Sequence, residues 1–335
     1  MVSQIHYRKD TDLPWRRVKK GGGFSFVNGQ GKRIPKTLES RVLGLVIPPA
    51  WSDVVISADP QDYVQAIGTD AKGRRQYIYH PEWIKHNQEH KFDQMISFGE
   101  RLPTLRKAVR AHMKDRKLTK ERVVATVVWL LEHTFIRVGN KEYAEENKSY
   151  GLTTMREKHI EVKGNKMTFS FEGKSGVLHE LDVTNPVVAK TVRACLDIPG
   201  YQLFQYLDED KNKQEVDSRD VNSYLQVHTG ADFSAKDFRT WGGSVIAGDS
   251  LYKKGNAKDE SELKTNILEV VCSVSEHLGN TKNVCRKYYI HPEIFKSYER
   301  DILVPHFKRS YSRKSSKKLR LTPEEYATWS LIKDA

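Results

Sequence analysis

The feature that most constrains the fold is a change in hydrophobic periodicity close to residue 90. Before this point, short β-branched and aromatic runs are separated by Gly, Pro and Asp turns, a pattern typical of antiparallel strands. After it, apolar residues recur with the spacing of amphipathic helices over longer segments. Because 335 residues are enough to bury two separate cores, we expect two domains. The predicted fold class is α+β, with a small antiparallel β domain at residues 1–88 and a larger, mainly α domain at residues 89–335.

The small domain is expected to begin with a flexible polar segment over residues 1–23, which ends in three consecutive glycines. Its predicted strands lie at residues 24–27, 54–56, 63–67 and 76–79. Trp51 follows a Pro-Pro turn and is expected to belong to the core. The polar segment 85–90 is the predicted hinge between the domains.

The larger domain is expected to contain a helix that is capped at Thr119, carries a continuous apolar stripe and ends at Gly139. This helix would place Arg137 at its C-terminal end. Three alternating runs between residues 160 and 183 predict a three-stranded β-meander, with Lys174 exposed on its second turn. Further helices are expected to begin at Asn185–Pro186, Ser218, Ser234 and about Ser261, the last of them ending at Gly279.

The chain carries 56 Lys and Arg against 43 Asp and Glu, a formal net charge of +13. This surplus favours a polyanionic partner, nucleic acid first, although an ordinary basic protein fits the charge equally well. The three cysteines have no zinc-ligand spacing, and no apolar segment has the length of a membrane span or the form of a leader. We therefore expect a soluble intracellular protein without disulfides, structural zinc or membrane contact.

Two glycine-lysine pairs resemble phosphate-binding loops without completing the motif. Gly173-Lys174-Ser175 has Thr168 where the motif requires its first glycine, and Gly31-Lys32 is followed by Arg33. The acidic residues form no pattern typical of a two-metal site. We therefore expect no ATP dependence, no metal and no other cofactor.

Tyr289 lies in a segment rich in cations, and a tyrosine phenolate is a nucleophile that can attack a phosphodiester and be displaced again. Without a metal, the transition state needs guanidinium groups, which match phosphate oxygens bidentately. A lysine on a turn can supply the proton that the leaving oxygen requires. The candidates are Arg137, Lys174, Lys236 and Arg239, each expected at the edge of a regular element. Each alone is more typical of an ordinary surface cation, and only the combination indicates catalysis.

A series of motifs occurs in a specific order between about residues 35 and 300. They are Ile47-Pro-Pro-Ala-Trp51, Gly73-Arg-Arg-Gln-Tyr-Ile-Tyr79, Ile136-Arg-Val-Gly139, Gly151-Leu-Thr-Thr154, Phe171-Glu-Gly-Lys174, Lys236-Asp-Phe-Arg-Thr-Trp241, Leu278-Gly-Asn280 and Tyr289-Ile-His-Pro292. In this order the chain resembles the type IB DNA topoisomerases, in the compact form found in poxviruses and some bacteria. The resemblance implies a larger domain of the tyrosine recombinase and topoisomerase IB type.

The resemblance also implies a role for each matching residue. Tyr289 matches the nucleophile, which takes the 3′ phosphate of the cleaved strand and frees a 5′ hydroxyl. Arg137 and Arg239 match the arginines that bind the scissile phosphate, and Lys174 matches the general acid. Lys236 matches a further lysine near the phosphate, with a lesser role.

Asn280 occupies the position that is histidine in poxviral and eukaryotic members and asparagine in bacterial-type members. An amide can donate a hydrogen bond to a phosphate oxygen but carries no charge, so weaker transition-state support and less pH sensitivity are expected there. In the small domain, matches to DNA-contacting residues are Arg74, Gln76, Tyr77 and Tyr79, and a further match is Tyr143. Tyr79 fits packing within the sheet as well.

The resemblance implies an enzyme that relaxes supercoiled duplex DNA by transient cleavage of one strand and religation. It also implies a monomer that closes as a clamp around the duplex, in the bacterial nucleoid or, for a viral member, in the virion or viral factory. The basic segment from Lys308 to Arg320, with seven Lys or Arg in thirteen residues, is predicted to be a disordered arm that holds DNA, or an ordered part of the clamp.

Two other functions remain open at this point. A tyrosine recombinase uses a related catalytic set, but it usually carries His-x-x-Arg where this chain has Lys236-x-x-Arg239, and its N-terminal lobe is normally helical. A DNA-binding protein that keeps the fold without catalysis would need a lost catalytic group, and only Asn280 departs from the poxviral set. Both comparisons favour the topoisomerase.

Overall fold

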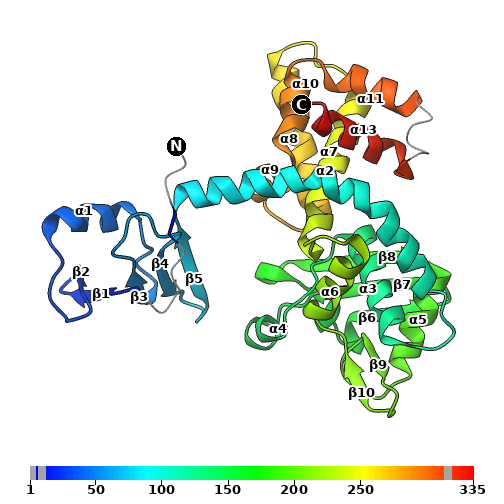
Figure 1. Ribbon diagram of the computed structural model, residues 1–335, viewed down its shortest axis with the longest axis horizontal. Coiled ribbons are helices and arrows are strands. Elements are labelled where there is room, and N and C mark those ends of the chain that lie inside the picture. Colours follow the sequence, from blue (N-terminus) through cyan, green and yellow to red (C-terminus); the bar gives the residue numbers. More distant parts are fainter. Residues whose placement is uncertain (1–4, 7–12, 313–318) are drawn as a thin grey trace. The chain divides into compact units, whose positions relative to one another are not determined.

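The computed structural model describes residues 5–6, 13–312 and 319–335 of the protein. Contacts between residues divide the chain into two compact units, Met1–Lys91 and Phe92–Ala335, here called the N-terminal and C-terminal units. Figure 1 shows strands β1 to β5 and helix α1 in the first unit, and the three-stranded sheet with most of the helices in the second. The fold is therefore mixed, with an antiparallel sheet in the N-terminal unit and a mainly helical C-terminal unit.

The sheet of the N-terminal unit is antiparallel throughout, in the order β2-β1-β3-β4-β5. Its strands are β1 (Trp15–Lys20), β2 (Gly23–Val27), β3 (Ser52–Ile56), β4 (Val64–Thr69) and β5 (Arg75–Tyr79). Helix α1 (Lys36–Gly44) contributes Val42 to a core that also contains Trp15 and Ile56, and Trp51 is partly buried against this core. The four strands expected from the sequence are present in the sheet.

Two elements of this unit contradict the sequence-based expectations. Residues 15–20 were expected to be flexible but form β1, because Trp15 is buried and anchors a strand whose other residues are mostly exposed cations. Helix α1 was not expected because Val42 is its only buried residue, so the segment carries almost no apolar periodicity.

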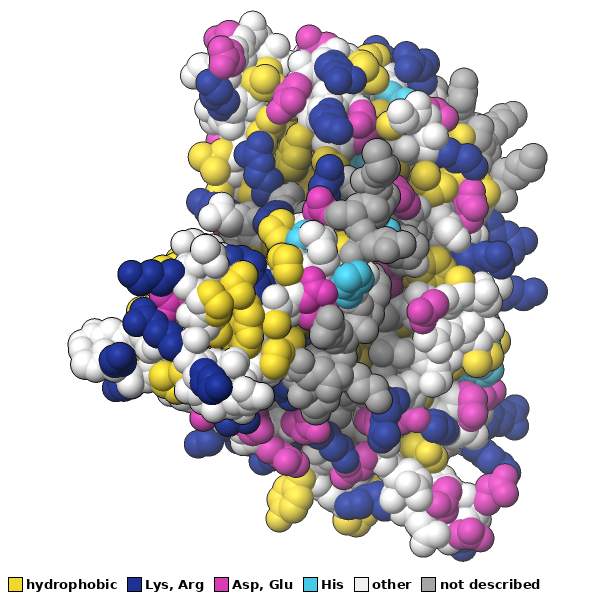
Figure 2. Space-filling model, turned by 60° about the vertical axis from the view of Figure 1, so that its left-hand side comes forward, with side chains coloured by type: hydrophobic (Ala, Val, Ile, Leu, Met, Phe, Trp, Pro, Cys, Tyr) yellow, Lys and Arg dark blue, Asp and Glu magenta, His cyan; other side chains and the backbone are white. Residues whose placement is uncertain are grey.

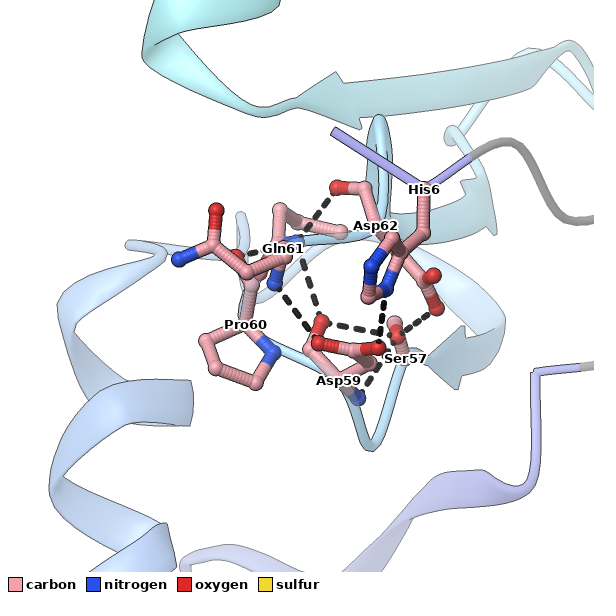
Figure 3. A network of polar contacts seen from close by, with 7 residues as sticks. His6, Ser57, Asp59, Pro60, Gln61 and Asp62 are labelled. Atoms are coloured by element: carbon pink, nitrogen blue, oxygen red, sulfur yellow. Dashed lines mark hydrogen bonds and ion pairs between the residues drawn. The ribbon is translucent and has the colours of Figure 1, made fainter. Parts of the chain in front are cut away.

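A loop between β3 and β4 is stabilised by the network of hydrogen bonds drawn in Figure 3. The Ser57 hydroxyl donates to Asp62, and Asp59 accepts from the Gln61 backbone N–H at 2.9 Å. His6 Nδ1 lies 2.7 Å from Asp59 Oδ2, which ties the start of the described chain to this loop. The ligand atoms of His6, Asp59 and Asp62 lie within 4.8 Å of one another, the grouping that a metal site would need. The protein's own hydrogen bonds explain why these side chains lie together, and they hold the loop in place.

Helix α2 runs from Pro81 to His112 and therefore includes the segment 85–90, which was expected to be a hinge. The segment is helical, its residues 85–87 are exposed, and the division between the two units falls directly after it, at Lys91, so the hinge stays a prediction. The apolar residues of α2 that lie beyond this segment, from Phe92 to Val109, belong to the main core of the C-terminal unit.

The predicted meander is confirmed as a sheet in the order β6-β7-β8, with strands Ile160–Lys163, Lys166–Glu172 and Leu178–Thr184. Its buried residues Met167, Phe169 and Phe171 pack into the core that includes helices α3 (Lys120–Thr134) and α5 (Pro186–Leu196). The remaining elements of the unit are α4 (Lys141–Asn147), β9 (Gln205–Leu207), β10 (Lys213–Glu215), α6 (Ser218–Thr229), α7 (Ala235–Lys254), α8 (Glu260–Leu278), α9 (Lys282–Tyr288), α10 (Pro292–Glu299), α11 (Leu303–Ser312) and α13 (Pro323–Lys333).

Two helix boundaries differ from the predictions. Helix α3 is capped at Thr119 as expected but ends at Thr134, because Phe135 turns into the left-handed region (φ 54°). Helix α6 is capped by Asp217, whose carboxylate accepts two backbone N–H groups, so Ser218 is its first residue. Ser234 caps α7, and α8 ends at the left-handed Gly279, both as predicted.

The basic segment from Lys308 to Arg320 is not a disordered arm over its first five residues, since Lys308–Ser312 belong to helix α11. That helix is held by Phe307, which is fully buried, and by the Tyr311 hydroxyl, which donates to Asp249 at 2.5 Å. Residues 313–318 of the segment lie outside the described part of the chain. The chain then returns to the core through α13, so an ordered helix follows the basic segment.

In the described part of the chain, no helix combines the length and apolar character that crossing a bilayer requires.

Candidate active site

A cavity of about 510 Å³ in the C-terminal unit brings together residues that are distant in the sequence. Its lining consists of Arg137, Lys174, Val177, Ser275, Glu276, Gly279, Asn280, Thr281, Val284 and Tyr289. Four of the six predicted catalytic residues are therefore in one place. Arg239 lies behind the wall of this cavity, next to Arg137, and Lys236 is exposed on α7 and is not among the described residues of the lining.

Arg239 is held rigidly by the ends of two helices. Its side chain is 4% exposed, and its guanidinium donates to the Phe135 carbonyl and to the Leu278 carbonyl, the latter at 2.6 Å. These carbonyls belong to the last turn of α8 and to the residue that ends α3, where helices leave acceptors unpaired. The guanidinium carbon also lies 5.1 Å from the centre of the Tyr289 ring. The burial and the fixed acceptors give this arginine one orientation.

Arg137 follows the end of α3 and reaches the same place from a loop. Its Nη2 donates to Asn280 Oδ1 at 2.5 Å and to the Gly279 carbonyl at 3.3 Å. Burial, followed by the nearby charge of Arg239, lowers the pKa of Arg137 to about 10, so the group stays protonated at neutral pH. Two partly desolvated cations side by side are costly, and an anion placed between them removes that cost.

Asn280 uses only one end of its amide within the protein. While Oδ1 accepts from Arg137, the Nδ2 group is buried and has no hydrogen-bond partner among the residues described. A buried donor without a partner costs free energy, about 1–3 kcal/mol. The donor set of two guanidinium groups and one amide suits a phosphate oxygen.

Tyr289 lies immediately after helix α9, at its C-terminal cap. The backbone N–H of Tyr289 donates to the Cys285 carbonyl at 3.0 Å. The Ser244 hydroxyl donates to the Tyr289 carbonyl at 3.3 Å and accepts from the His291 N–H at 2.9 Å. A Cβ at Gly243 would lie 2.7 Å from the Tyr289 carbonyl oxygen, so α7 supports this part of the backbone closely.

Lys174 occupies the turn between β7 and β8, as predicted, and its side chain is exposed. The Gly173 N–H donates to the Val177 carbonyl at 2.8 Å, and the Gly176 N–H donates to the Gly173 carbonyl at 3.1 Å. Lys174 thus extends into the cavity from a compact turn with solvent access.

Sequence reasoning missed His179 and Ser244. His179 packs between the Lys174 turn and Gly279, and burial, with smaller effects from Arg137 and Arg239, lowers its pKa. His179 is the second residue of β8, and in the sequence it showed nothing more than the alternation typical of a strand. Ser244 acts through backbone contacts made within a helix, which periodicity cannot indicate.

The predicted DNA contacts of the N-terminal unit cluster around β5. Asp70 accepts from Arg74 Nε at 2.8 Å and from Gln76 Nε2 at 3.0 Å, which fixes both side chains. The rings of Tyr77 and Tyr79 are stacked, with centroids 5.7 Å apart. Both tyrosines also pack against a small core of the sheet, so the packing expected for Tyr79 is present. The side chain of Tyr143 lies outside the described part of the structure.

The basic surplus is spread widely over the surface. Figure 2 shows Lys and Arg side chains across the visible face, interspersed with acidic ones.

Comparisons with known proteins identify the family of the chain. Residues 80–315 match the family described as eukaryotic DNA topoisomerase I, catalytic core, and residues 23–70 match the bacterial DNA topoisomerase IB N-terminal domain. The chain is 33% identical over 303 residues to DNA topoisomerase 1B of Acanthamoeba polyphaga mimivirus, covering 85% of this chain and 90% of that protein. It is 26% identical over 257 residues to DNA topoisomerase 1B of vaccinia virus (strain Copenhagen), covering 73% and 76%.

Among solved structures, the chain is similar to the XerH site-specific recombinase bound to its difH substrate. The TM-score is 0.34 and the identity 13%, over 59% of this chain and 51% of that one, a likeness too low to support a conclusion.

The family models that match most of the chain describe DNA topoisomerases. The chain belongs to the type IB DNA topoisomerases. It is an isomerase that relaxes supercoiled duplex DNA through a transient single-strand break, which confirms the expectation drawn from the motifs.

Proposed function

We propose that Tyr289 is the nucleophile of this topoisomerase and that Arg137, Arg239 and Asn280 bind the scissile phosphate. The observation that carries the proposal is the buried Asn280 Nδ2 donor, which has no partner in the described structure and lies beside two fixed guanidinium groups. A non-bridging phosphate oxygen would satisfy this donor and separate the two cations. These donors are fixed before substrate binds, as electrostatic stabilisation of a transition state requires.

In the cleavage step, Tyr289 Oη attacks the scissile phosphorus and the phenol proton passes to solvent. The bond between phosphorus and the 5′ oxygen breaks as Lys174 Nζ gives a proton to that oxygen. Religation reverses both events. One phosphoester bond replaces another, so the covalent 3′-phosphotyrosine preserves the bond energy and no ATP is required. Lys236, which is exposed on α7, is assigned a supporting contact to the DNA backbone near the site.

We assign DNA contacts outside the cavity to Arg74, Gln76, Tyr77 and Tyr79 in the N-terminal unit and to Tyr143 in the C-terminal unit. Gln76 can read adenine bidentately, and Arg74 can bind guanine or phosphate. The two units would act together on one duplex as a monomeric clamp, in the compartment that holds the DNA.

The test is relaxation of a negatively supercoiled plasmid in EDTA without ATP, by the wild type, Tyr289→Phe and Tyr288→Phe. Tyr288 is the matched control because it adjoins the nucleophile but is not among the described residues that line the cavity. We expect relaxation by the wild type and by Tyr288→Phe, and none by Tyr289→Phe. A covalent adduct with labelled DNA, trapped by detergent, should form with the same two proteins. Relaxation by Tyr289→Phe would refute the assignment, and recombinant products would favour a recombinase.

A further inference from the structure

His179 lies behind the cavity, packed between Gly173 and Gly279, with its ring seated on the core. In the register of β7 and β8 it pairs with Phe171. The two rings are stacked, with centroids 5.0 Å apart and planes at 12°. Because Phe171 is only 5% exposed, the histidine ring rests on a fixed surface.

The edge of the imidazole contacts two backbone segments that both require glycine. A Cβ at Gly173 would lie 2.7 Å from His179 Cδ2 and Nε2, closer than carbon atoms approach. A Cβ at Gly279 would lie 3.0 Å from Nε2 and would overlap Cε1. Gly173 directly precedes Lys174, and Gly279 directly precedes Asn280. The ring therefore separates the turn that carries the proposed general acid from the helix end that carries the proposed phosphate ligand, and it contacts both.

The hydrogen bonds of the Lys174 turn are local, between Gly173, Gly176 and Val177. They fix the shape of the turn but not its distance from α8. The imidazole, in contact with both, sets that distance. A general acid that is displaced by about 1 Å can lose about 100-fold in rate.

We propose that His179 is a positioning residue, which holds the Lys174 turn against the end of α8 so that the lysine ammonium reaches the leaving 5′ oxygen. The proposal rests on the general-acid role of Lys174 proposed above. Burial and the neighbouring arginines keep the imidazole neutral, so it adds no charge of its own to the site. Its contribution is steric, and its loss should affect the proton transfer more than the binding of phosphate.

The test compares two DNA substrates in single-turnover cleavage, one natural and one with sulfur in place of the leaving 5′ oxygen. A thiolate leaves without protonation because its conjugate acid is far stronger than an alcohol, so the sulfur substrate needs no general acid. We expect His179→Ala to cleave the natural substrate about 10- to 100-fold more slowly than wild type, and the sulfur substrate within about threefold of wild type. Lys174→Ala should show the same pattern, whereas Arg239→Ala should be slow on both substrates.

Three other results would each overturn either the role of His179 or that of Lys174. If Lys174→Ala is restored by sulfur and His179→Ala is not, His179 does not act through the general acid. Wild-type cleavage of the natural substrate by His179→Ala would also overturn the proposal. If sulfur fails to restore Lys174→Ala, the general-acid assignment itself falls, and the two failures are thereby distinguished.

A second variant crowds the same contact without altering the histidine. Gly173 has φ −92°, which alanine adopts without strain, so Gly173→Ala adds only a methyl group against the imidazole. We expect it to slow cleavage of the natural substrate and to be restored by sulfur. In the His179→Ala background, where the space is vacant, the added methyl should cost less than about threefold. Fully additive losses would refute a shared contact, and thermal unfolding of each variant identifies any loss of fold.

Discussion

The substitution Asn280→Ala tests the proposed phosphate site most directly, because the structure gives its Nδ2 donor no other described partner. A hydrogen bond to a charged oxygen contributes about 1.5–3 kcal/mol. Since 1.36 kcal/mol is tenfold in rate, loss of this donor in the transition state should slow cleavage about 10- to 160-fold. The Arg137 guanidinium also loses its acceptor at 2.5 Å and keeps the Gly279 carbonyl at 3.3 Å, which places the expected loss toward the upper end.

Asn280→Asp is the matched comparison, because it keeps the shape and the acceptor for Arg137 but replaces the donor with a negative oxygen. We expect it to cleave more slowly than Asn280→Ala, since the carboxylate repels the phosphate, yet to be at least as stable. The assay is single-turnover cleavage of a duplex whose short leaving strand dissociates, at saturating enzyme. DNA affinity is measured separately for each variant in the Tyr289→Phe background. Faster cleavage by Asn280→Asp than by Asn280→Ala, or an alanine variant within threefold of wild type, would refute the assigned role.

Three further predictions follow from the packing, an ion pair and the charge. Gly243→Ala should lower both relaxation activity and the melting temperature, because its methyl would lie 2.7 Å from the backbone carbonyl that follows α9. The control is Gly44→Ala, which should change neither, because no described atom lies within 4 Å of the new methyl. Burial raises the pKa of Glu325, but hydrogen bonds from Arg106 outweigh this effect and the net pKa is lowered. The carboxylate therefore stabilises the fold at pH values above its unfolded pKa of about 4.5. This stability is lost as the pH falls through the pKa of the folded state. Unfolding measured across that range should show a shallower acid limb for Glu325→Gln, and Glu325→Ala should cost about 3–5 kcal/mol at neutral pH. DNA affinity should fall steeply with salt, and Arg74→Ala should reduce the slope of log affinity against log salt by about 1 if that side chain binds a phosphate.

Much of the secondary structure was predictable because it is encoded locally. The cap at Thr119, the stop at Gly279 and the alternation of β7 each depend on neighbouring residues, and the structure has all three. Strand β1 was not predictable, because its exposed face is basic and its only buried side chain is Trp15. Nor was the end of α3, because Phe135 adopts a left-handed conformation that tertiary contacts of its carbonyl with Arg239 support.

The candidate site was predictable in its residue types but not in its supporting contacts. The motifs include Arg137, Lys174, Asn280 and Tyr289, four residues that the cavity brings together. The contacts of Ser244 with the backbone after α9 and of His179 with Gly279 join segments far apart in the sequence. Such contacts leave no periodic signal, because a glycine that a ring presses against looks the same in sequence as a glycine in a turn.

The site divides into a fixed part and an exposed part, and the division agrees with the chemistry. Arg239 is buried and bound to two carbonyls, and Arg137 is bound to Asn280, so the protein itself holds the groups to which we assign the phosphate. Lys174 is exposed on a short turn whose position depends on the packing of one ring. A phosphate cradle gains from rigidity because its donors must already point at the developing charge. A proton donor must instead approach an oxygen that moves away as the strand breaks and returns when it is resealed, so changes in the turn should alter cleavage and religation while leaving phosphate binding intact.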